Sequence, residues 1–369
     1  MGDARHAWAA PGLTDDREKR FLTKLYDDSE RAPMRSLLCV KPGELSLVER
    51  PKPARREGEV LVRIRRAGVC GTDLHIFEGT HPYLNYPRVI GHELAGEVVE
   101  TDSGSGLRTG QQVCIIPYLA CGKCVACRKG KSNCCQKIAV LGVHTDGGMG
   151  DFVCVPEGNV MPADGISLDE AAMVEFLAIG AHAVRRAAPG PKDRILVVGA
   201  GPIGIGCMIF AKLTGGSVTA LDMREDRLAF CRDKLGIRQT IKVGPDAKAE
   251  MAALTDGEFF DCVIDATGNA KAMMAGFDYV AHGGAYVFVS IVLDQISFSD
   301  PEFHKRETTL LGSRNATRED FETVFAALRA GHVPTTALIS HRAPLADAPQ
   351  RFPEWIRPET GVIKAILEI

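Results

Sequence analysis

RILVVGAGPIG, at residues 194–204, is the stretch that decides the fold of this chain. Residues 194–198 form an apolar run that is typical of a strand buried on both faces of a parallel sheet, and a helix-length stretch follows at 203–213. Further strand-like and helical segments alternate along the chain, at 217–221, at 225–236, up to Asp265 and at 285–289. Because strand alternating with helix is the pattern of βαβ units, the sequence predicts an α/β protein with a doubly wound parallel sheet.

The turn between that first strand and helix fits G-x-G-x-x-G and predicts a dinucleotide site. Gly199 permits the tight turn, Gly201 lets the backbone approach a pyrophosphate, and Gly204 allows the helix to pack closely on the sheet. The helix begins at Pro202 and Ile203 and directs the positive end of its dipole toward the phosphates.

Asp222 ends the next strand, 23 residues after Gly199. A carboxylate at this position accepts hydrogen bonds from the ribose hydroxyls and repels a 2′-phosphate, which favours NAD over NADP. Arg227 follows closely; we expect it to contact the cofactor, although a nearby arginine also weakens the preference for NAD. Thr267 and Ser290 follow later strands, whose carboxyl ends face the ligand crevice in such sheets.

Composition places the chain among globular proteins and limits its function. Hydrophobic residues make up 45% and charged residues 25% of the sequence, and the net charge of −3 leaves no basic excess for binding nucleic acid. No apolar run reaches the roughly 18 residues that a membrane span requires, and residues 1–33 lack the apolar core of a signal peptide. We therefore expect a cytoplasmic protein whose clustered cysteines bind metal rather than form disulfides.

Residues 34 to about 175 are strand-rich and interrupted by glycines. The alternating segments that indicate half-buried strands are 59–64, 97–100 and 112–117. This part predicts an antiparallel, barrel-like domain. Residues 1–33 show no persistent apolar period, so we interpret them as an extension outside the core fold.

Four cysteines are spaced C-x2-C-x2-C-x7-C, close enough for their thiolates to complete a tetrahedral shell around a structural zinc ion. They are Cys121, Cys124, Cys127 and Cys135. Because Cys134 precedes the last of them, the spacing leaves the fourth ligand open by one residue. A nucleic-acid-binding zinc ribbon is the alternative, but the basic residues around this cluster are not accompanied by aromatic ones.

A second, more dispersed set could hold a catalytic metal. Cys70 and His92 lie in glycine-containing turns, and Glu175 comes where the alternating half of the chain begins. Three such ligands leave a fourth position for water or substrate, which is the pattern of a catalytic zinc ion. From spacing alone, a structural role for His92 is the competing interpretation.

Taken together, Gly91-His92-Glu93, the four-cysteine lobe and the loop at 199–204 have the order and spacing of one family. Over residues 34–369 the chain resembles the zinc-dependent medium-chain alcohol dehydrogenases. A glutamate as third ligand, 24 residues before the first glycine of the loop, resembles the polyol and threonine dehydrogenase branch.

The resemblance also implies a domain organisation. After the extension at 1–33, a GroES-like β-barrel catalytic domain would comprise 34–180 with 318–369, and a Rossmann cofactor domain would comprise 181–317. Members of this branch assemble as dimers or tetramers, so we expect a homo-oligomer.

Several segments resemble the bacterial L-galactonate and L-gulonate 5-dehydrogenases within that branch. They are NCC at 133–135, GVHTDGG at 142–148, AHAVRRAA at 181–188, FSDPEFHK at 298–305 and GSRNAT at 312–317. The resemblance implies reversible oxidation of a secondary hydroxyl of a sugar acid or polyol to a ketone. Zinc would act as the Lewis acid and NAD would accept the hydride.

Three residues receive catalytic roles from the same resemblance. Thr72 and His75 occupy the places of the hydroxyl and the imidazole that relay the proton through the cofactor ribose. Glu93 resembles a carboxylate that supports the metal from behind its ligands.

A sugar-acid substrate also needs a cation for its carboxylate. We place this cation at Arg314, because arginine can hold a carboxylate through two hydrogen bonds. Lys305 and Arg306 compete for the same role.

Three rival functions remain open on sequence alone. A non-catalytic, zinc-stabilised NAD-binding sensor predicts one zinc ion per chain and no turnover. A metal-free quinone or enone reductase has the same fold but would lack Cys70 and the four-cysteine lobe. A nearer rival is another zinc dehydrogenase of the branch, acting on threonine, sorbitol or another diol.

Overall fold

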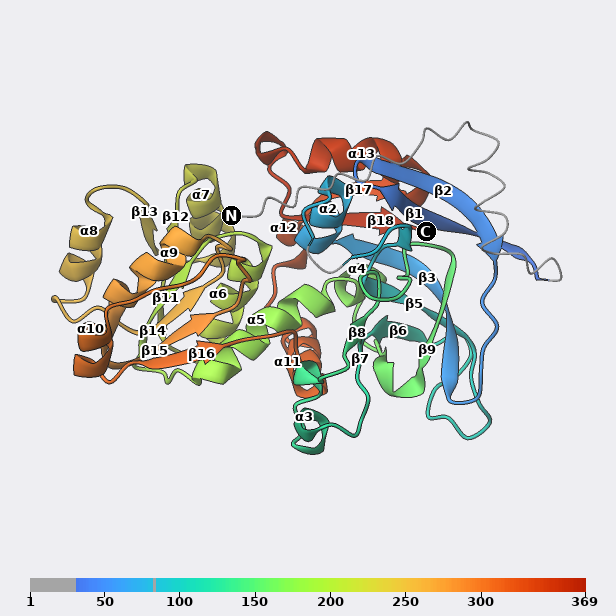
Figure 1. Cartoon of the computed structure of the whole chain (residues 1–369), viewed down its shortest axis with the longest axis horizontal. Helices are drawn as coiled ribbons and strands as arrows, with labels where there is room; N and C mark the ends of the chain where they lie inside the picture. Colours follow the sequence, from blue (N-terminus) through green and yellow to red (C-terminus); the bar gives the residue numbers. More distant parts are fainter. Residues whose placement is uncertain (1–30, 82–83) are drawn as a thin grey trace, which may run out of the picture.

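The computed structural model describes residues 31–81 and 84–369. The expected extension at 1–33 lies outside the described residues except for its last three. Figure 1 shows two lobes, one built on a parallel sheet and the other rich in β-structure, with helix α5 running between them. None of the helices in the described part of the chain has the length and hydrophobicity to span a bilayer.

The first lobe contains a six-stranded sheet in the order β13-β12-β11-β14-β15-β16, with every neighbouring pair parallel. Its strands are β11 (Arg194–Val198), β12 (Ser217–Asp222), β13 (Gln239–Lys242), β14 (Phe260–Asp265), β15 (Val280–Phe288) and β16 (Thr309–Gly312). The order reverses between β11 and β14, and in such sheets a ligand crevice opens at the carboxyl ends there. The predicted doubly wound sheet is confirmed.

Both faces of the central strand β11 are buried, as its apolar run predicts. Ile195 and Val197 pack in one core cluster, whereas Leu196 and Val198 pack in another on the opposite face. The connecting helices are α6 (Pro202–Leu213), α7 (Glu225–Leu235), α8 (Ala247–Leu254), α9 (Ala270–Ala275) and α10 (Asp300–Lys305).

The second lobe contains a seven-stranded sheet, in which β10-β6-β5-β3-β18-β17 form a continuous path and β9 pairs with β3. The strands are β3 (Glu59–Val69), β5 (Glu93–Glu100), β6 (Gln112–Ile115), β9 (Phe152–Pro156), β10 (Val160–Pro162), β17 (Ile339–Pro344) and β18 (Lys364–Glu368). The pairs that join β3, β5, β6 and β9 are antiparallel, as their alternation predicts, whereas the C-terminal β17 and β18 pair in parallel.

Smaller elements complete this lobe and surround the sheet. They are the three-stranded sheet β2 (Glu44–Pro51), β1 (Pro33–Lys41) and β4 (Arg88–Val89), the pair β7 (Tyr118–Leu119) and β8 (Ala139–Val140), and the helices α2 (Gly71–Glu78), α3 (Val125–Arg128), α4 (Leu168–Ala171), α12 (Thr335–Leu338) and α13 (Ala348–Trp355). Figure 1 shows the C-terminal elements α13, β17 and β18 against the strands of the N-terminal part, so the end of the chain completes the β-rich lobe.

Helix α5 (Val174–Ala187) joins the two lobes through one continuous core that includes Tyr118 of the β-rich lobe and Ile195 of the parallel sheet. It packs against α11 (Arg318–Arg329) and against α6. A Cβ atom at Gly180 would lie 2.5 Å from the backbone carbon of Gly206 in α6, so the two helices approach as closely as glycine permits. The boundary placed at residue 180 stays a proposal, because α5 runs unbroken across it.

This helix contact leads to a stability prediction. We expect Gly180→Ala to lower the free energy of unfolding by about 2 kcal/mol, because the new methyl group overlaps the α6 backbone. The matched control is Gly206→Ala, whose Cβ would lie at an ordinary 3.5 Å from the Phe176 carbonyl oxygen and should be neutral or stabilise by roughly 0.5 kcal/mol. Urea denaturation measures both; equal destabilisation by the two variants would contradict the close contact.

Candidate active site between the two lobes

The turn that carries Cys70 and the loop that carries His92 are held together by one buried carboxylate. Asp73 lies in the first turn of α2, and its Oδ2 accepts a hydrogen bond from the backbone N–H of Cys70 at 3.0 Å. Its Oδ1 accepts a second from the N–H of Gly91 at 3.2 Å. The sequence analysis did not single out Asp73, although its place three residues after the helix N-cap is a capping-box position.

Three potential metal ligands converge beside these turns. The Cys70 sulfur, a ring nitrogen of His92 and a carboxylate oxygen of Glu93 lie within 4.8 Å of one another. His92 and Glu93 are buried, and Cys70 is half-buried. A thiolate, an imidazole and a carboxylate are the donor types that zinc prefers.

Glu175 lies next to this cluster rather than in its tightest group. It stands in the first turn of α5 and is buried, and its charge acts electrostatically on His92. Its Oε1 accepts a hydrogen bond from the Tyr118 hydroxyl, whereas its Oε2 has no hydrogen-bond partner among the described residues. One carboxylate oxygen is therefore oriented and the other is left for a further partner.

The Glu93 carboxylate, by contrast, forms an ion pair with a lysine from the last strand of the chain. Lys364 Nζ lies 2.6 Å from both carboxylate oxygens of Glu93 and 3.4 Å from the Val69 carbonyl oxygen. It also lies 4.3 Å above the ring of Phe176. Both charged side chains are almost completely buried, with 1% or less of each side chain exposed. The sequence analysis missed Lys364 as well.

The charge pattern of the cluster fits a cation. Burial lowers the pKa of His92, but the neighbouring Asp73 and Cys70 outweigh burial, and the net effect raises this pKa well above its usual value. Burial raises the pKa of Glu175, and the nearby His92 opposes that rise. His92 Nδ1 is buried without a hydrogen-bond partner among the described residues. Orphaned donor atoms and excess negative charge are what a zinc ion would satisfy, so the residues present fit this metal.

The four-cysteine cluster lies in the lobe that contains α3. The sulfurs of Cys121, Cys124, Cys127 and Cys135 all lie within 4.8 Å of one another, whereas Cys134 is exposed and lies outside the cluster. Backbone N–H groups of Cys127 and Gln136 lower the pKa of Cys124 to about 6, which favours the thiolate that a metal needs. The arrangement also fits a zinc ion, with Cys135 as the fourth ligand.

The glycine loop after β11 has the shape that its motif predicts. Gly199 has a φ of +95°, and a Cβ at Gly204 would lie 1.8 Å from the Gly199 carbonyl oxygen. At Gly201, by contrast, a Cβ would meet nothing within 4 Å, so the loop is open on that side. Pro202 begins α6 and Ile203 packs partly against the core, which places the helix N-terminus at this open side.

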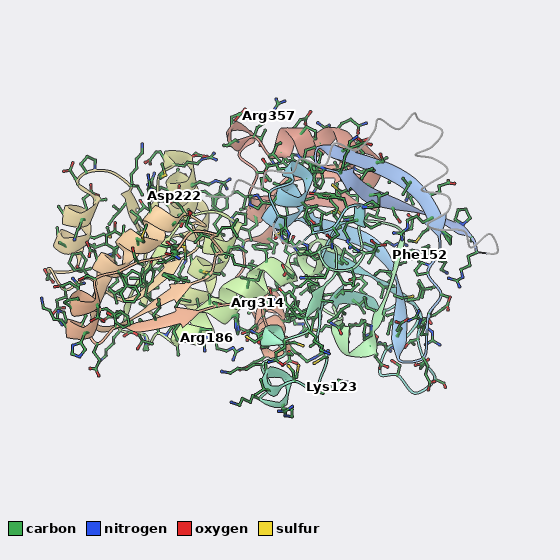
Figure 2. The ribbon with its side chains drawn as sticks, in the orientation of Figure 1. Lys123, Phe152, Arg186, Asp222, Arg314 and Arg357 are labelled. Carbon is green, nitrogen blue, oxygen red and sulfur yellow. The ribbon has the colours of Figure 1, made fainter. Side chains whose placement is uncertain are left out.

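The acidic residue at the end of β12 is held by the backbone of the same crevice. Asp222 Oδ2 accepts a hydrogen bond from Ala200 N–H at 2.6 Å, and its Oδ1 accepts one from Arg224 N–H at 2.8 Å. Arg227 donates to the Val362 carbonyl oxygen at 2.7 Å through Nη2, and its buried Nη1 has no partner among the described residues. Figure 2 shows Asp222 in the parallel-sheet lobe.

Two further residues of the predicted cofactor set lie at the ends of β14 and β15. Thr267 donates through its hydroxyl to Asp265 Oδ1 at 2.8 Å, which fixes the turn after β14. Gly268 follows with a φ of +62°, and a Cβ there would lie 3.8 Å from Ser290. The structure therefore brings Thr267 and Ser290 to the same edge of the sheet.

The remaining predicted residues are only partly buried or exposed. Thr72 is half-buried in α2, and the His75 side chain is 63% exposed, with Nδ1 3.3 Å from Thr80 Oγ1 and 3.4 Å from Glu78 Oε2. Arg314 is exposed just after β16, and Figure 2 shows it where the two lobes meet.

The two competing cations have other contacts. Arg306 donates to the Asp278 and Val280 carbonyl oxygens at 3.3 and 2.8 Å, so its guanidinium is engaged within its own lobe. Lys305 lies 3.7 Å from Glu302 on the exposed helix α10.

Comparisons with known proteins show which families and proteins the chain is similar to. The alcohol dehydrogenase GroES-like domain model matches residues 56–165, and the zinc-binding dehydrogenase model matches residues 202–330. The chain is 42% identical to the L-galactonate-5-dehydrogenase of Escherichia coli K12, covering 90% of this chain and 98% of that protein. It is 33% identical to the L-threonine 3-dehydrogenase of Bacillus velezensis, covering 86% and 94%. The crystal structure of the alcohol dehydrogenase RspB of E. coli CFT073 with NADH superimposes with a TM-score of 0.86 at 28% identity, covering 92% of this chain and all of that one.

The buried ion pair behind the metal cluster gives one prediction. Lys364→Met removes the ammonium group and leaves Glu93 charged in the interior, so we expect the free energy of unfolding to fall by about 3–5 kcal/mol. The double variant Glu93→Gln with Lys364→Met removes both charges and should recover most of that loss. Denaturant unfolding measures both; a double variant no more stable than the single one would contradict the pairing.

The cysteine cluster gives a second prediction, on metal content. We expect Cys124→Ser to reduce bound zinc from about two ions to about one per chain, because three thiolates no longer close the tetrahedral shell. Cys134→Ser is the matched control and should keep the full content, since Cys134 lies outside the cluster. Atomic emission on dialysed protein measures the ratio, and zinc loss from the Cys134 variant instead would overturn the ligand assignment.

Proposed function

Because the chain belongs to the zinc-dependent medium-chain alcohol dehydrogenases, we propose that it oxidises a secondary hydroxyl of a sugar acid to a ketone with NAD as hydride acceptor. The substrate class we favour is an aldonate of the L-galactonate or L-gulonate type. It follows the similarity to the E. coli L-galactonate-5-dehydrogenase and is supported by the charge of the groups beside the metal cluster.

A set of cationic and imidazole groups beside the cluster is the observation that carries this substrate class. Burial and the neighbouring Arg314 and Arg88 lower the pKa of His144. Burial together with His75, His144 and His92 lowers the pKa of His81. These electrostatic effects mean that the groups lie near one another. Such a grouping favours an anionic ligand, because a carboxylate relieves the repulsion between them.

His144 is prepared as a hydrogen-bond donor in this group. Its Nδ1 accepts a hydrogen bond from the Val140 N–H at 3.1 Å, so in the neutral ring the proton is on Nε2. An Nε2–H group can donate to a carboxylate or a hydroxyl of the substrate. We propose Arg314 as the main partner of the carboxylate, because its guanidinium can donate two parallel hydrogen bonds.

For the catalytic metal we propose Cys70, His92 and Glu175 as ligands. Both oxygens of Glu93 are already held by Lys364, whereas Glu175 has an unpaired oxygen, so Glu175 is the better third ligand. Glu93 would then support the site electrostatically from behind. When bound, the zinc ion would supply a Lewis acid for the substrate hydroxyl, and NAD would supply the hydride acceptor.

The chain's own groups would place the cofactor and remove the proton. The open side of Gly201 and the start of α6 would receive the pyrophosphate, and Asp222 would accept hydrogen bonds from the ribose hydroxyls. Thr72 would receive the proton and His75 would pass it on. The exposure of His75 suits the last member of such a relay, because it can release the proton to water.

A homo-oligomer and a cytoplasmic location remain predictions. A threonine dehydrogenase is the second candidate, since an amino-acid substrate also carries a carboxylate and a similar relative has that activity in its name. The two candidates differ at the other end of the substrate. A threonine dehydrogenase must bind an ammonium group, which a cationic neighbour such as Arg314 disfavours.

A substrate panel tests this proposal. We expect NAD reduction with L-galactonate or L-gulonate at a KM about tenfold or more below that for the matching neutral alditols, because a charge-assisted hydrogen bond contributes roughly 1.5–3 kcal/mol. Arg314→Ala should raise the aldonate KM about tenfold and leave the alditol KM unchanged.

Lys305→Ala is the matched control and should leave both KM values unchanged. Turnover of L-threonine in preference to any aldonate, or an aldonate KM unmoved by Arg314→Ala, would refute the corresponding part of the proposal.

A further inference from the structure

We propose that buried Asn133 is a positioning residue for Arg314, and that the four-cysteine lobe thereby sets the affinity for the substrate carboxylate. This inference rests on the proposed function, because it concerns how the turn of Arg314, the proposed carboxylate-binding cation, is held in place. The residues that carry it come from parts of the chain that are far apart in sequence.

Asn133 lies inside the cysteine lobe, two residues before the ligand candidate Cys135, and only 3% of it is exposed. Its Nδ2 donates to the backbone carbonyl oxygen of Arg314 at 2.8 Å and lies 3.1 Å from His182 Nε2. A side-chain amide nitrogen has two hydrogens, so both are used. In return, the Asn315 amide donates to the Asn133 carbonyl oxygen at 3.4 Å.

The orientation of the Asn133 amide is fixed by the groups behind it. His182 Nδ1 lies 2.8 Å from Asp320 Oδ2, and Arg185 donates to Asp320 Oδ1 at 2.7 Å. Although burial opposes ionisation, the hydrogen bonds from His182 and Arg185 hold the pKa of Asp320 below its usual range. Arg185 Nη2 also lies 3.2 Å from His182 Nδ1, but the closer, ionised Asp320 favours the proton on Nδ1, and this tautomer turns the Nε2 lone pair toward Asn133.

Two acceptors, the His182 ring nitrogen and the Arg314 carbonyl oxygen, thus face the same end of Asn133. The opposite amide orientation would bring an oxygen against both of them and is excluded electrostatically. The burial of Asn133, His182 and Asp320 strengthens this selection, because a buried polar atom without a partner costs about 1–3 kcal/mol.

The segment that Asn133 holds is a tight turn after β16. Ser313 N–H donates to the Phe288 carbonyl oxygen at 2.8 Å, which ties the start of the turn to β15. Asn315 has a φ of +51°, a left-handed conformation that asparagine tolerates better than most residues. On the far side, Thr317 N–H donates to Asp320 at 2.7 Å and begins α11.

Arg314 is thus the exposed residue of a turn whose backbone is anchored on both sides. Among the described residues, the hydrogen bond to the Arg314 carbonyl oxygen comes from the side chain of Asn133, beside the cysteine cluster. Without that bond the guanidinium would still be present, but its backbone would be free to move, and a bidentate contact to a carboxylate requires a fixed approach. The loss should therefore fall on the charged end of the substrate and not on the reacting hydroxyl.

The experiment compares Asn133→Ala and Asn315→Gly with wild type, using an aldonate and its neutral alditol. Asn315→Gly keeps the left-handed turn accessible and removes the side chain that donates to the Asn133 carbonyl oxygen, so it serves if Asn133→Ala does not fold. We expect Asn133→Ala to raise the aldonate KM about tenfold with kcat and the alditol KM nearly unchanged. For Asn315→Gly we expect a smaller rise in the same direction. Ser132→Ala, at an exposed neighbouring position, should change neither.

Calorimetric titration of the aldonate into the enzyme–NADH complex gives a readout without turnover and should show the same loss of affinity. In a double-mutant cycle, Asn133→Ala should add nothing once Arg314 is alanine. A uniform loss of kcat with both substrates, or full additivity in the cycle, would overturn the inference. If Arg314→Ala raises the aldonate KM but neither asparagine variant does, the proposed function stands and this inference fails. If no aldonate is oxidised, the proposed function itself fails.

Discussion

Buried negative charge at the junction of the two lobes is the constraint on which the rest of the structure depends. Asp73, Glu93 and Glu175 lie in the interior beside Cys70. An uncompensated charge in such a place costs several kcal/mol, so each carboxylate needs a hydrogen-bond donor or an ionic partner. Backbone N–H groups satisfy Asp73, Lys364 satisfies Glu93, and the Tyr118 hydroxyl satisfies half of Glu175. The potential ligand atoms that remain without such a partner could all coordinate a cation.

Helix α5 connects the buried carboxylates to the turn that carries Arg314. Its first turn carries Glu175, and two turns later it carries His182, which belongs to the network that holds the turn of Arg314. The same helix packs on α6, whose N-terminus forms the glycine loop of the cofactor crevice. A single helix therefore carries Glu175 beside the metal cluster, packs on the helix that follows the glycine loop, and contributes His182 to the network around the Arg314 turn. A shift of α5 along its axis would disturb all three.

The sequence predicted those parts of the site that depend on local spacing. The glycine loop, Asp222 and the cysteine cluster each lie within a short stretch whose geometry follows from the chain itself, and the doubly wound sheet follows from its alternating pattern. The parts it missed are pairings across the fold. Lys364 and Glu93 are 271 residues apart, and Asn133 and Arg314 are 181 apart. Lys364 begins a short apolar strand, and a lysine at the start of a strand is expected to be exposed. Only the packing of that strand against β3 shows that Lys364 is buried.

If the chain oxidises a sugar acid as proposed, the charges around the site would help to determine which hydroxyl reacts. The metal end is rich in carboxylates, whereas Arg314 and His144 lie at the other end, together with Arg88, which is paired with Asp146 at 3.4 Å. A carboxylate held by Arg314 would fix one terminus of the proposed substrate, and the distance from there to the metal cluster would then select one carbon along the substrate. Because the turn of Arg314 is anchored by Asn133 rather than by the substrate, that separation is set before binding. On this proposal, regioselectivity would depend on the contact between Asn133 and the Arg314 turn as well as on the groups that touch the reacting hydroxyl.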